Sequence, residues 1–306
     1  MIKTVKKAIK NHRSAYRHGK NRVKNLWKRR RRPLDSAITS QIGWYPFNHN
    51  WKLLVVLDAL RFDVAKESMA TNRLGEPKKI WSVGANSPSW INRTFGSASP
   101  TILQNTAYIS ANPFTDQAPE ALNVRDNVQK YAFDEQIGTI PPRPVTDRAI
   151  AVGRETSLDR YIVHYMQPHL PPVDYQSDLS DFIAPPDSDQ ESTNPWRDIE
   201  EGIRESSKVE SAYRDNIHTV TSDLQLLLKN FGAEEVVITA DHGNFLGEWG
   251  RWGHRYWDSI HPAVRYVPYW ETSASDERTH SPSEYNQSGQ NTSQMERLRA
   301  LGYYDS

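Results

Sequence analysis

The stretch VVITADHGNFLGE, from Val236 to Glu248, carries the most informative pattern in the sequence. It opens with β-branched and small apolar residues, which are typical of a strand that is buried on both faces. The run then ends on Asp241 and His242, two residue types that bind metals and that are costly to bury without a compensating partner. The stretch therefore predicts a central strand that delivers ligands to one edge of a sheet.

Two other short runs have the same character: KLLVVLD, residues 52–58, and RYIVHYM, residues 160–166. Ahead of the Val236 run, residues 207–232 place apolar side chains every three or four positions, as in a helix with one buried face. Gly232 stands where the C-terminal cap of that helix belongs. A helix followed by a buried strand is the second half of a β-α-β unit. We therefore expect an α/β fold with a parallel sheet covered by helices.

Charge is distributed unevenly along the chain. Residues 1–32 contain 14 Lys and Arg and no acidic residue, whereas the rest of the chain has 24 basic and 37 acidic residues. We expect a basic arm over residues 1–43, an α/β domain over 44–270, and a polar, largely disordered tail over 271–306 that ends in a short helix. Residues 1–34 suit an anionic membrane surface or nucleic acid, and a solvated tail without a partner is the other interpretation.

Composition excludes several classes of site. The sequence has no Cys, so disulfides and thiolate metal sites are ruled out. No apolar run approaches the ~20 residues of a membrane span, and no apolar segment follows the N-terminal charges as it would in a secretory signal. We therefore expect a cytoplasmic protein, with peripheral attachment at the inner membrane surface as an open alternative.

Each of the three expected strands ends on residues of ligand type. They are Asp58 after the first strand, His164 and His169 at and after the end of the second, and Asp241 with His242 after the third. The carboxyl ends of parallel strands gather at one sheet edge, where ligands bind. Two carboxylates and an imidazole suit a divalent cation, Zn²⁺ or Mn²⁺ rather than Ca²⁺, and no organic cofactor is expected. In the alternative, Asp58 caps the following helix and Asp241 only forms a turn.

A hydroxyl nucleophile is offered by the segment GANSPSWINRTF, residues 84–95. Ser87 is followed by Pro88, which predicts Ser87 as a helix N-cap with proline in the first helical position. The positive end of that helix would stabilise a developing negative charge. An ordinary capping serine is the alternative, and Ser89 and Thr94 are rival hydroxyls.

Taken together, these motifs resemble the sulfatase-like branch of the alkaline phosphatase superfamily. The resemblance rests on LLVVLDALRFD, VHYMQPHLPP, ITADHGNFLGEWGRWGH and VRYVP, in order from about residue 52 to residue 268, and on RLRALGY near the end. It implies a three-layer α/β sandwich in which a mixed, mainly parallel sheet has helices on both faces. It also implies metal-assisted displacement at phosphorus or sulfur through a covalent intermediate on a metal-bound nucleophile.

The resemblance implies roles for individual residues as well. Asp58, Asp241 and His242 would hold one metal together with the nucleophile, for which Ser87 is the candidate. His169 and His254 would ligate a second metal or bind the oxygens of the ester.

Two further residues are candidates for substrate binding on the same resemblance, namely His164 and Arg61. Arg61 could instead hold the loop that follows Asp58.

Departures from the family's pattern bear on the chemistry. Laid on NSPSW, the sulfatases' Cys/Ser-x-Pro-x-Arg motif places Asn86 at the nucleophile and Trp90 at the arginine. Leu57 stands before Asp58, where the family has an adjacent pair of Asp residues. Gln167 occupies a position where related proteins often have Asp, which argues against a complete second metal site. Phosphate esters are therefore favoured over sulfate esters.

The sequence thus predicts a metal-dependent hydrolase or transferase that acts on phosphate esters through a metal-bound hydroxyl. Its substrate would be a phosphorylated or sulfated small molecule, a glycan or a lipid-linked compound. The alternative is a catalytically degenerate relative that binds nucleic acid or a membrane surface through its basic arm.

Overall fold

The structure is a computed structural model that describes residues 42–69, 74–173, 195–202, 204–254, 259–286, 297–298 and 301. The chain divides into two compact units, Met1–Ile42 and Gly43–Ser306, and the described helices and strands belong to the second. The basic arm, with its predicted partners, lies outside the described residues. Within the described ranges no helix combines the length and the apolar character needed to cross a membrane.

Seven strands of the described residues form the central sheet, in the order β2-β9-β6-β1-β5-β3-β4. They are β1 (Leu53–Asp58), β2 (Lys78–Trp81), β3 (Thr106–Ser110), β4 (Val124–Asn127), β5 (Arg160–Pro168), β6 (Phe231–Thr239) and β9 (Tyr266–Asp276). The five strands from β6 to β4 run parallel, whereas β9 is antiparallel to both of its neighbours. This arrangement confirms the mixed, mainly parallel sheet.

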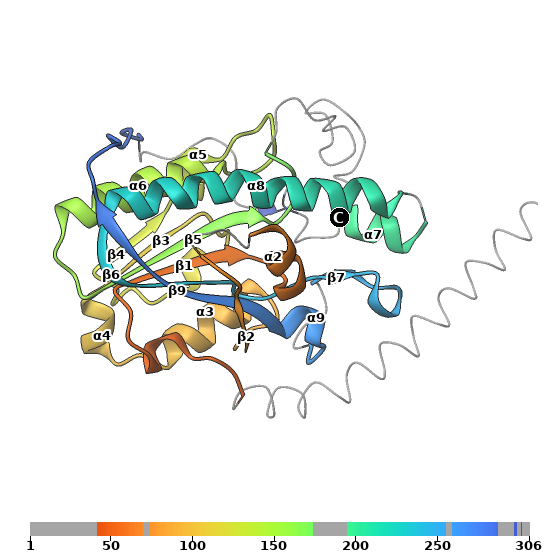
Figure 1. The fold of residues 1–306 in the computed structure, drawn as a ribbon, viewed down its shortest axis with the longest axis horizontal. Helices are drawn as coiled ribbons and strands as arrows, with labels where there is room; N and C mark the ends of the chain where they lie inside the picture. The colour runs from red at the N-terminus through yellow and green to blue at the C-terminus, as the bar shows by residue number, and fades with distance from the viewer. Residues whose placement is uncertain are drawn as a thin grey trace, which may run out of the picture. The chain divides into compact units, whose positions relative to one another are not determined.

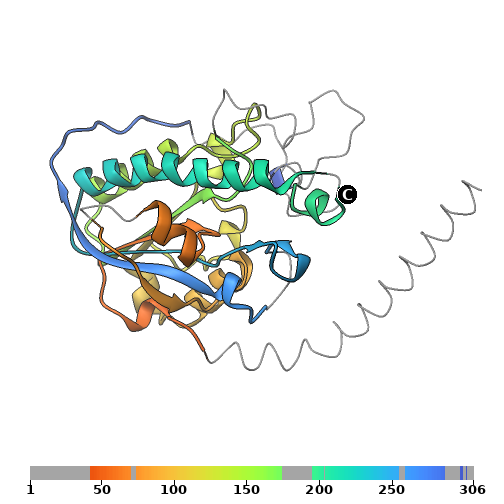
Figure 2. The ribbon, with the colours of Figure 1, turned by 45° about the vertical axis from the view of Figure 1, so that its right-hand side comes forward.

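Helices cover both faces of this sheet (Figures 1 and 2). One face carries α6 (Pro142–Glu155) and α8 (Ser206–Asn230), and the other carries α3 (Ser87–Gly96) and α4 (Pro100–Gln104). The shorter elements are α2 (Phe62–Ser68), α5 (Gln129–Ala132), α7 (Pro195–Glu200), α9 (Pro262–Arg265) and the 3-10 turns η1 (Pro46–Asn48), η2 (Thr115–Gln117) and η4 (Glu248–Gly250). The predicted three-layer α/β sandwich is therefore confirmed.

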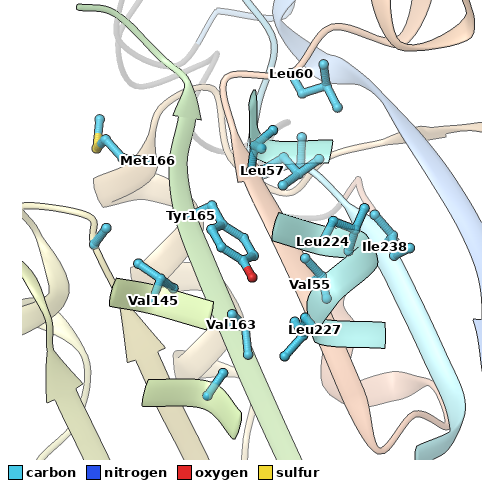
Figure 3. Packing of buried hydrophobic residues seen from close by; sticks show 14 of the residues in the cluster. Val55, Leu57, Leu60, Val145, Val163, Tyr165, Met166, Leu224, Leu227 and Ile238 are labelled. Carbon is cyan, nitrogen blue, oxygen red and sulfur yellow. The ribbon is translucent and has the colours of Figure 1, made fainter. Parts of the chain in front are cut away.

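Strand β1 explains why the sequence forms three layers. All six of its residues are buried, and successive side chains of a strand point to opposite faces. Val55 and Leu57 join the core beneath α6 and α8, in which Leu224 and Leu227 of α8 also lie (Figure 3). Leu54 and Val56 join the second core beneath α3. A strand that is apolar at every position is thus required, because neither of its faces meets water.

The loop after β6 carries a small ribbon of its own. Strand β7 (Phe245–Leu246) pairs antiparallel with β8 (Trp252–Gly253). This ribbon lies beyond Asp241 and His242 in the chain, so the segment that follows the expected ligands is ordered rather than a simple connection.

Two predicted boundaries need correction, one at the end of a helix and one at the end of the domain. Helix α8 ends at Asn230 and the chain passes directly into β6, so Gly232 belongs to a strand and does not cap the helix. The predicted boundary at residue 270 falls inside β9, where Thr272 still pairs with Val236. Beyond Tyr269 strand β9 no longer pairs with β2 and has β6 as its neighbour on one side only, which allows this end of the strand to be as polar as a tail.

Beyond β9, the chain is held against helix α6. His280 Nε2 lies 2.6 Å from Asp147 Oδ1, and the Tyr285 hydroxyl donates to Asp147 Oδ2 at 2.9 Å. The rest of the predicted division into arm, domain and tail stays a prediction.

Shortening an apolar side chain of α8 tests the core that supports the sheet. We expect Leu227→Ala to lower the free energy of unfolding by about 2–5 kcal/mol, since it leaves a cavity between the helix and the strands. The measurement is urea unfolding followed by circular dichroism. The control is Gln225→Ala on the exposed side of the same helix, for which we expect a change within about 0.5 kcal/mol. Equal losses in the two variants would contradict this description of the core.

Candidate metal centre

Three of the five predicted metal ligands meet at the carboxyl edge of the sheet. Asp58 is the last residue of β1, and Asp241 and His242 follow the end of the adjacent β6. All three are completely buried. One ligand atom from each lies within 4.8 Å of the others, and this is the only such group in the described part of the chain. Neighbouring parallel strands therefore deliver an Asp-Asp-His donor set to one point.

Each of the two carboxylates has one oxygen held by the protein and one left over. Asp58 Oδ2 accepts the side-chain N–H of Asn112 at 2.7 Å. Asp241 Oδ1 accepts the backbone N–H groups of Ala59 at 3.0 Å and of His242 at 2.8 Å. Asp58 Oδ1 and Asp241 Oδ2 are buried and have no hydrogen-bond partner among the described residues. Buried oxygens of this kind are costly unless a cation compensates them.

The spacing of the donors fits a small tetrahedral cation. His242 Nε2 lies 3.6 Å from Asp58 Oδ1 and 3.4 Å from Asp241 Oδ2, and the Ser87 hydroxyl lies 3.4 Å from the same nitrogen. Bonds of 2.0–2.1 Å in a tetrahedral zinc site place neighbouring ligand atoms about 3.3–3.4 Å apart. The residues present therefore match the size of a site for a small divalent cation.

The histidine is oriented as a ligand. His242 Nδ1 lies 2.8 Å from the carbonyl oxygen of Gly243, which places the ring proton on Nδ1 and leaves the lone pair of Nε2 facing the carboxylates. Gly243 itself is required by packing, because a β-carbon there would lie 2.3 Å from the carbonyl oxygen of Ala263. The sequence Asp-His-Gly is thus explained residue by residue.

The surroundings of Asp58, including Asp241, perturb its ionisation. Burial raises the pKa of Asp58 well above its ordinary value, and the nearby charge of Asp241 raises it further. Hydrogen bonds from Asn112 and Ser87 act in the opposite direction and do not overcome these effects. A bound divalent cation would reverse the balance, because it favours the charged form of both groups.

A strained turn fixes the geometry after β1. Ala59 has a φ of 62°, which is unusual for a residue with a β-carbon. Its N–H binds Asp241, and its carbonyl oxygen accepts the hydroxyl of Tyr213, a residue of α8, at 2.7 Å. The same hydroxyl accepts the N–H of Arg61 at 3.1 Å. Helix α8 thus holds the turn in a conformation that it would not adopt alone.

Arg61 does not contact the candidate cation site, and its predicted role in substrate binding needs correction. The guanidinium donates to Asp63, to the carbonyl oxygen of Asn244 at 3.1 Å and to Glu248 Oε1 at 2.7 Å. The side chain is 8% exposed, so its donors are directed at protein acceptors rather than at solvent. Arg61 therefore holds the loop after His242, whereas the alternative interpretation gave it the loop that follows Asp58.

Ser87 lies beside the carboxylates, one position later in the helix than predicted. Asn86 is the N-cap of α3 and forms a capping box with Ser89, and Ser87 is the first helical residue. The Ser87 hydroxyl is completely buried and lies 3.3 Å from Asp58 Oδ2. Because Asn86 supplies the cap, the interpretation of Ser87 as an ordinary capping serine is wrong.

The rival hydroxyls are placed differently. Ser89 Oγ donates to the carbonyl oxygen of Asn86 at 2.9 Å and accepts the N–H of Ala85 at 3.0 Å, so it is occupied by the cap. Thr94 lies further along α3, buried against the core, and no described hydrogen bond or ion pair links it to the carboxylates.

His169 and His254 lie next to His242 without completing a second ligand group in the described part of the chain. The ring of His254 lies 4.4 Å from that of His242 and 5.1 Å from that of His169. Nδ1 of His254 lies 2.8 Å from Asn244 Oδ1, and Nδ1 of His169 lies 2.6 Å from the carbonyl oxygen of Leu170. Burial lowers the pKa of His169 to about 4 and that of His254 well below its ordinary value. Both imidazoles are therefore neutral at neutral pH.

His164 is enclosed behind the carboxylates, which argues against its predicted contact with substrate. It is completely buried between Trp90, at 5.5 Å between ring centroids, and Tyr108, whose hydroxyl lies 2.9 Å from Nδ1. Its Nε2 lies 3.7 Å from Asp241 Oδ2. Its described contact with the carboxylates is therefore the one to Asp241.

Sequence reasoning missed the supporting residues of strand β3. Asn112, which holds Asp58, follows the run TAYIS, and Tyr108, which holds His164, lies within it. The signal was a short buried run that ends on a polar residue, the same pattern that identified the other strands.

Comparison with known proteins agrees with the topology. No protein-family model matches the chain, and no curated protein matches it in sequence. Among solved structures, the integral membrane protein lipooligosaccharide phosphoethanolamine transferase A (EptA) from Neisseria meningitidis is 13% identical, with a TM-score of 0.53. The match covers 78% of this chain and 51% of EptA, so the chain spans about half the length of that protein.

Two further similar structures are a 2-O GAG sulfatase and the C-terminal periplasmic domain of EptC from Escherichia coli in complex with Zn. The sulfatase is 13% identical with a TM-score of 0.44, over 72% of this chain and 64% of its own. The EptC domain is 13% identical with a TM-score of 0.34, over 78% of each chain.

These structures contradict the predicted cytoplasmic location and its variant at the inner membrane surface. EptA, which has the same fold over most of this chain, is an integral membrane protein. The sequence prediction was drawn from the absence of an apolar segment, which gives no information on where a domain of this fold works.

The chain therefore shares its overall fold, a mainly parallel sheet between helical layers, with EptA.

Proposed function

We propose that this chain is an extracytoplasmic, cation-dependent phosphotransferase or phosphoester hydrolase in which Ser87 is the nucleophile. The observation that carries the proposal is the buried Ser87 hydroxyl, 3.3 Å from Asp58 Oδ2 and 3.4 Å from His242 Nε2. A catalytic or ligand role explains why this hydroxyl is buried beside two carboxylates, each of which has one oxygen without a hydrogen-bond donor among the described residues.

Zinc is the proposed cation. Its tetrahedral ligand spacing matches the 3.4–3.6 Å distances from His242 Nε2 to the two unpaired carboxylate oxygens. An octahedral ion with similar bond lengths would place adjacent ligands closer, at about 2.9 Å. We propose Asp58, Asp241, His242 and Ser87 as its ligands. The cation would lower the pKa of the bound hydroxyl and neutralise charge on the phosphate oxygens.

The remaining chemistry falls to residues of the chain. Ser87 Oγ attacks phosphorus, the bond from phosphorus to the leaving alcohol breaks, and the phosphoryl group is left on Ser87. Asp58 Oδ2 is placed to take the hydroxyl proton, which passes to the leaving oxygen. In the second step water or an acceptor alcohol attacks the phosphoserine and releases Ser87. His242, Asn112 and Ala59 keep the reacting groups in place through the hydrogen bonds given above.

Several features support phosphate over sulfate and a lipid-linked or glycan acceptor. At the position where the sulfatase motif has arginine, Trp90 is 1% exposed and packs in the core beneath α3. EptA acts on lipooligosaccharide, and the similar sulfatase acts on GAG. We propose transfer of a phosphate-linked substituent to a hydroxyl of such a molecule as the principal reaction, with hydrolysis when water replaces the acceptor.

The competing interpretation is a binding protein without turnover. It depends on residues 1–34, which lie outside the described residues, and no observation on the described part favours it. The two experiments that follow separate it from the enzyme, because a binding protein would tolerate loss of both the cation and Ser87.

Acid should weaken cation binding through Asp58. In the cation-free protein the raised pKa of Asp58 means that a proton must leave before the cation can bind. The apparent affinity for Zn²⁺ should fall as pH is lowered, by up to about tenfold for each pH unit below that raised pKa. Competition with a chromophoric chelator between pH 5 and pH 8 measures this. Asp58→Asn should bind zinc weakly, and its affinity should depend less steeply on pH. A wild-type affinity that does not change with pH would contradict the site.

Replacing the nucleophile should abolish turnover while leaving the cation in place. We expect Ser87→Ala to reduce hydrolysis of a generic phosphodiester by at least about 10³-fold and to retain most of its zinc, because three ligands remain. The matched control is Ser89→Ala, two residues along the same helix, which should lose about 1 kcal/mol of stability through the cap and keep its activity.

The covalent step has its own measurement. Mass spectrometry of the quenched wild-type reaction should find the phosphoryl group on the peptide that contains Ser87. Full activity in Ser87→Ala, or label on Ser89, would show that the nucleophile has been assigned to the wrong hydroxyl.

A further inference from the structure

One polar atom at the site is left without a role by the proposed mechanism. His164 Nε2 is buried, has no hydrogen-bond partner among the described residues, and lies 3.7 Å from Asp241 Oδ2. That oxygen is the one that the protein leaves for a cation. A ring nitrogen enclosed at this point presents either a proton or a lone pair to the carboxylate. A proton would attract the carboxylate oxygen, whereas a lone pair would repel it.

The groups on the other side of the ring decide which is present. His164 Nδ1 lies 2.9 Å from the hydroxyl of Tyr108. Burial raises the pKa of Tyr108, so the phenol keeps its proton and can donate it to Nδ1. Ser110, two residues along β3, accepts the N–H of Asn112 at 3.0 Å.

The direction of this chain fixes the tautomer. A proton donated to Nδ1 by Tyr108 leaves the neutral ring with its own proton on Nε2, which faces Asp241. The opposite tautomer would aim a lone pair at a carboxylate oxygen in a buried site, which is repulsive. Strand pairing supports the arrangement, because Ser110 and His164 are register partners on β3 and β5.

We propose that His164 is a positioning residue that donates its Nε2–H to Asp241 Oδ2 and thereby orients this carboxylate for the cation. At 3.7 Å the two atoms stand just beyond hydrogen-bonding distance, and a small shift of either side chain would bring them within it. Through Asn112, which donates to Asp58 at 2.7 Å, the same strand β3 then supports both carboxylates. The inference rests on the proposed cation site and is independent of the role of Ser87.

The proposal differs from direct ligation by His164, and two substitutions separate them. His164→Leu removes donor and lone pair together, whereas His164→Gln restores an N–H donor and is a poor zinc ligand. We expect His164→Leu to weaken Zn²⁺ binding by about 10- to 100-fold, which is usual for partners that orient metal ligands, and His164→Gln to recover most of that loss. The measurement is chelator competition on the full chain with Zn²⁺ as the only added ligand.

Tyr108→Phe tests the hydrogen-bond chain without changing the imidazole. It removes only the hydroxyl that sets the tautomer, so the affinity for Zn²⁺ should fall, although by less than in His164→Leu. The matched control is Tyr165→Phe, which removes an equally buried hydroxyl from strand β5, paired with Thr146 at 2.8 Å and remote from the site. Thermal unfolding of the cation-free variants shows that any loss of affinity is not a loss of fold.

The outcomes are distinct. Wild-type zinc affinity in folded His164→Leu, or equal effects of Tyr108→Phe and Tyr165→Phe, would overturn the proposal. An equally large loss in His164→Gln and His164→Leu would also overturn it, because it would indicate that the ring binds the cation directly. If the wild-type protein binds no zinc, the proposed cation site itself fails, and with it the proposed function.

Discussion

The structure depends on the enclosure of two carboxylates, Asp58 and Asp241, at a point where the protein supplies a donor for only half of their oxygens. Isolated buried charges are among the costliest groups that a fold can contain, and an ordinary domain core would exclude them. The folded chain reduces this cost in part by raising the pKa of Asp58. A divalent cation removes it more completely, since both groups can then be charged. Cation binding and the stability of the sheet edge are therefore coupled.

The rest of the architecture keeps those two side chains from separating. β1 and β6 are adjacent parallel strands, so their carboxyl ends lie side by side without any contribution from loops. The left-handed conformation of Ala59 then turns the chain sharply after Asp58. The Ala59 N–H donates to Asp241 and its carbonyl oxygen accepts from Tyr213, and both bonds hold the turn. On the opposite face, the capping box of α3 fixes the first helical turn and with it Ser87. Each of these elements restrains a different residue of the same site.

Sequence patterns predicted the parts of the site that the strands position. The apolar runs before Asp58 and Asp241 identified buried parallel strands, and parallel strands leave little freedom in where their ends meet. The predictions that failed concern the placement of single side chains. Asn86 and Ser87 are both good N-cap residues, so the sequence did not distinguish the cap from the nucleophile position. Arg61 and His164 could each have faced substrate, and only packing shows the acceptors or aromatic rings that enclose them.

The protonation state of the neighbouring histidines limits the positive charge that the protein brings to the site. Both His169 and His254 have lowered pKa values because they are buried, and the proximity of other imidazoles adds to the effect. They therefore bring no positive charge to the site at neutral pH, although their rings lie within about 5 Å of one another. An anionic phosphate group that reaches Ser87 would meet two carboxylates and neutral imidazoles, an unfavourable surrounding without a cation. In the proposed reaction the electrostatic attraction for substrate would consequently come from the bound cation, and substrate binding and activation of the proposed nucleophile would depend on the same event.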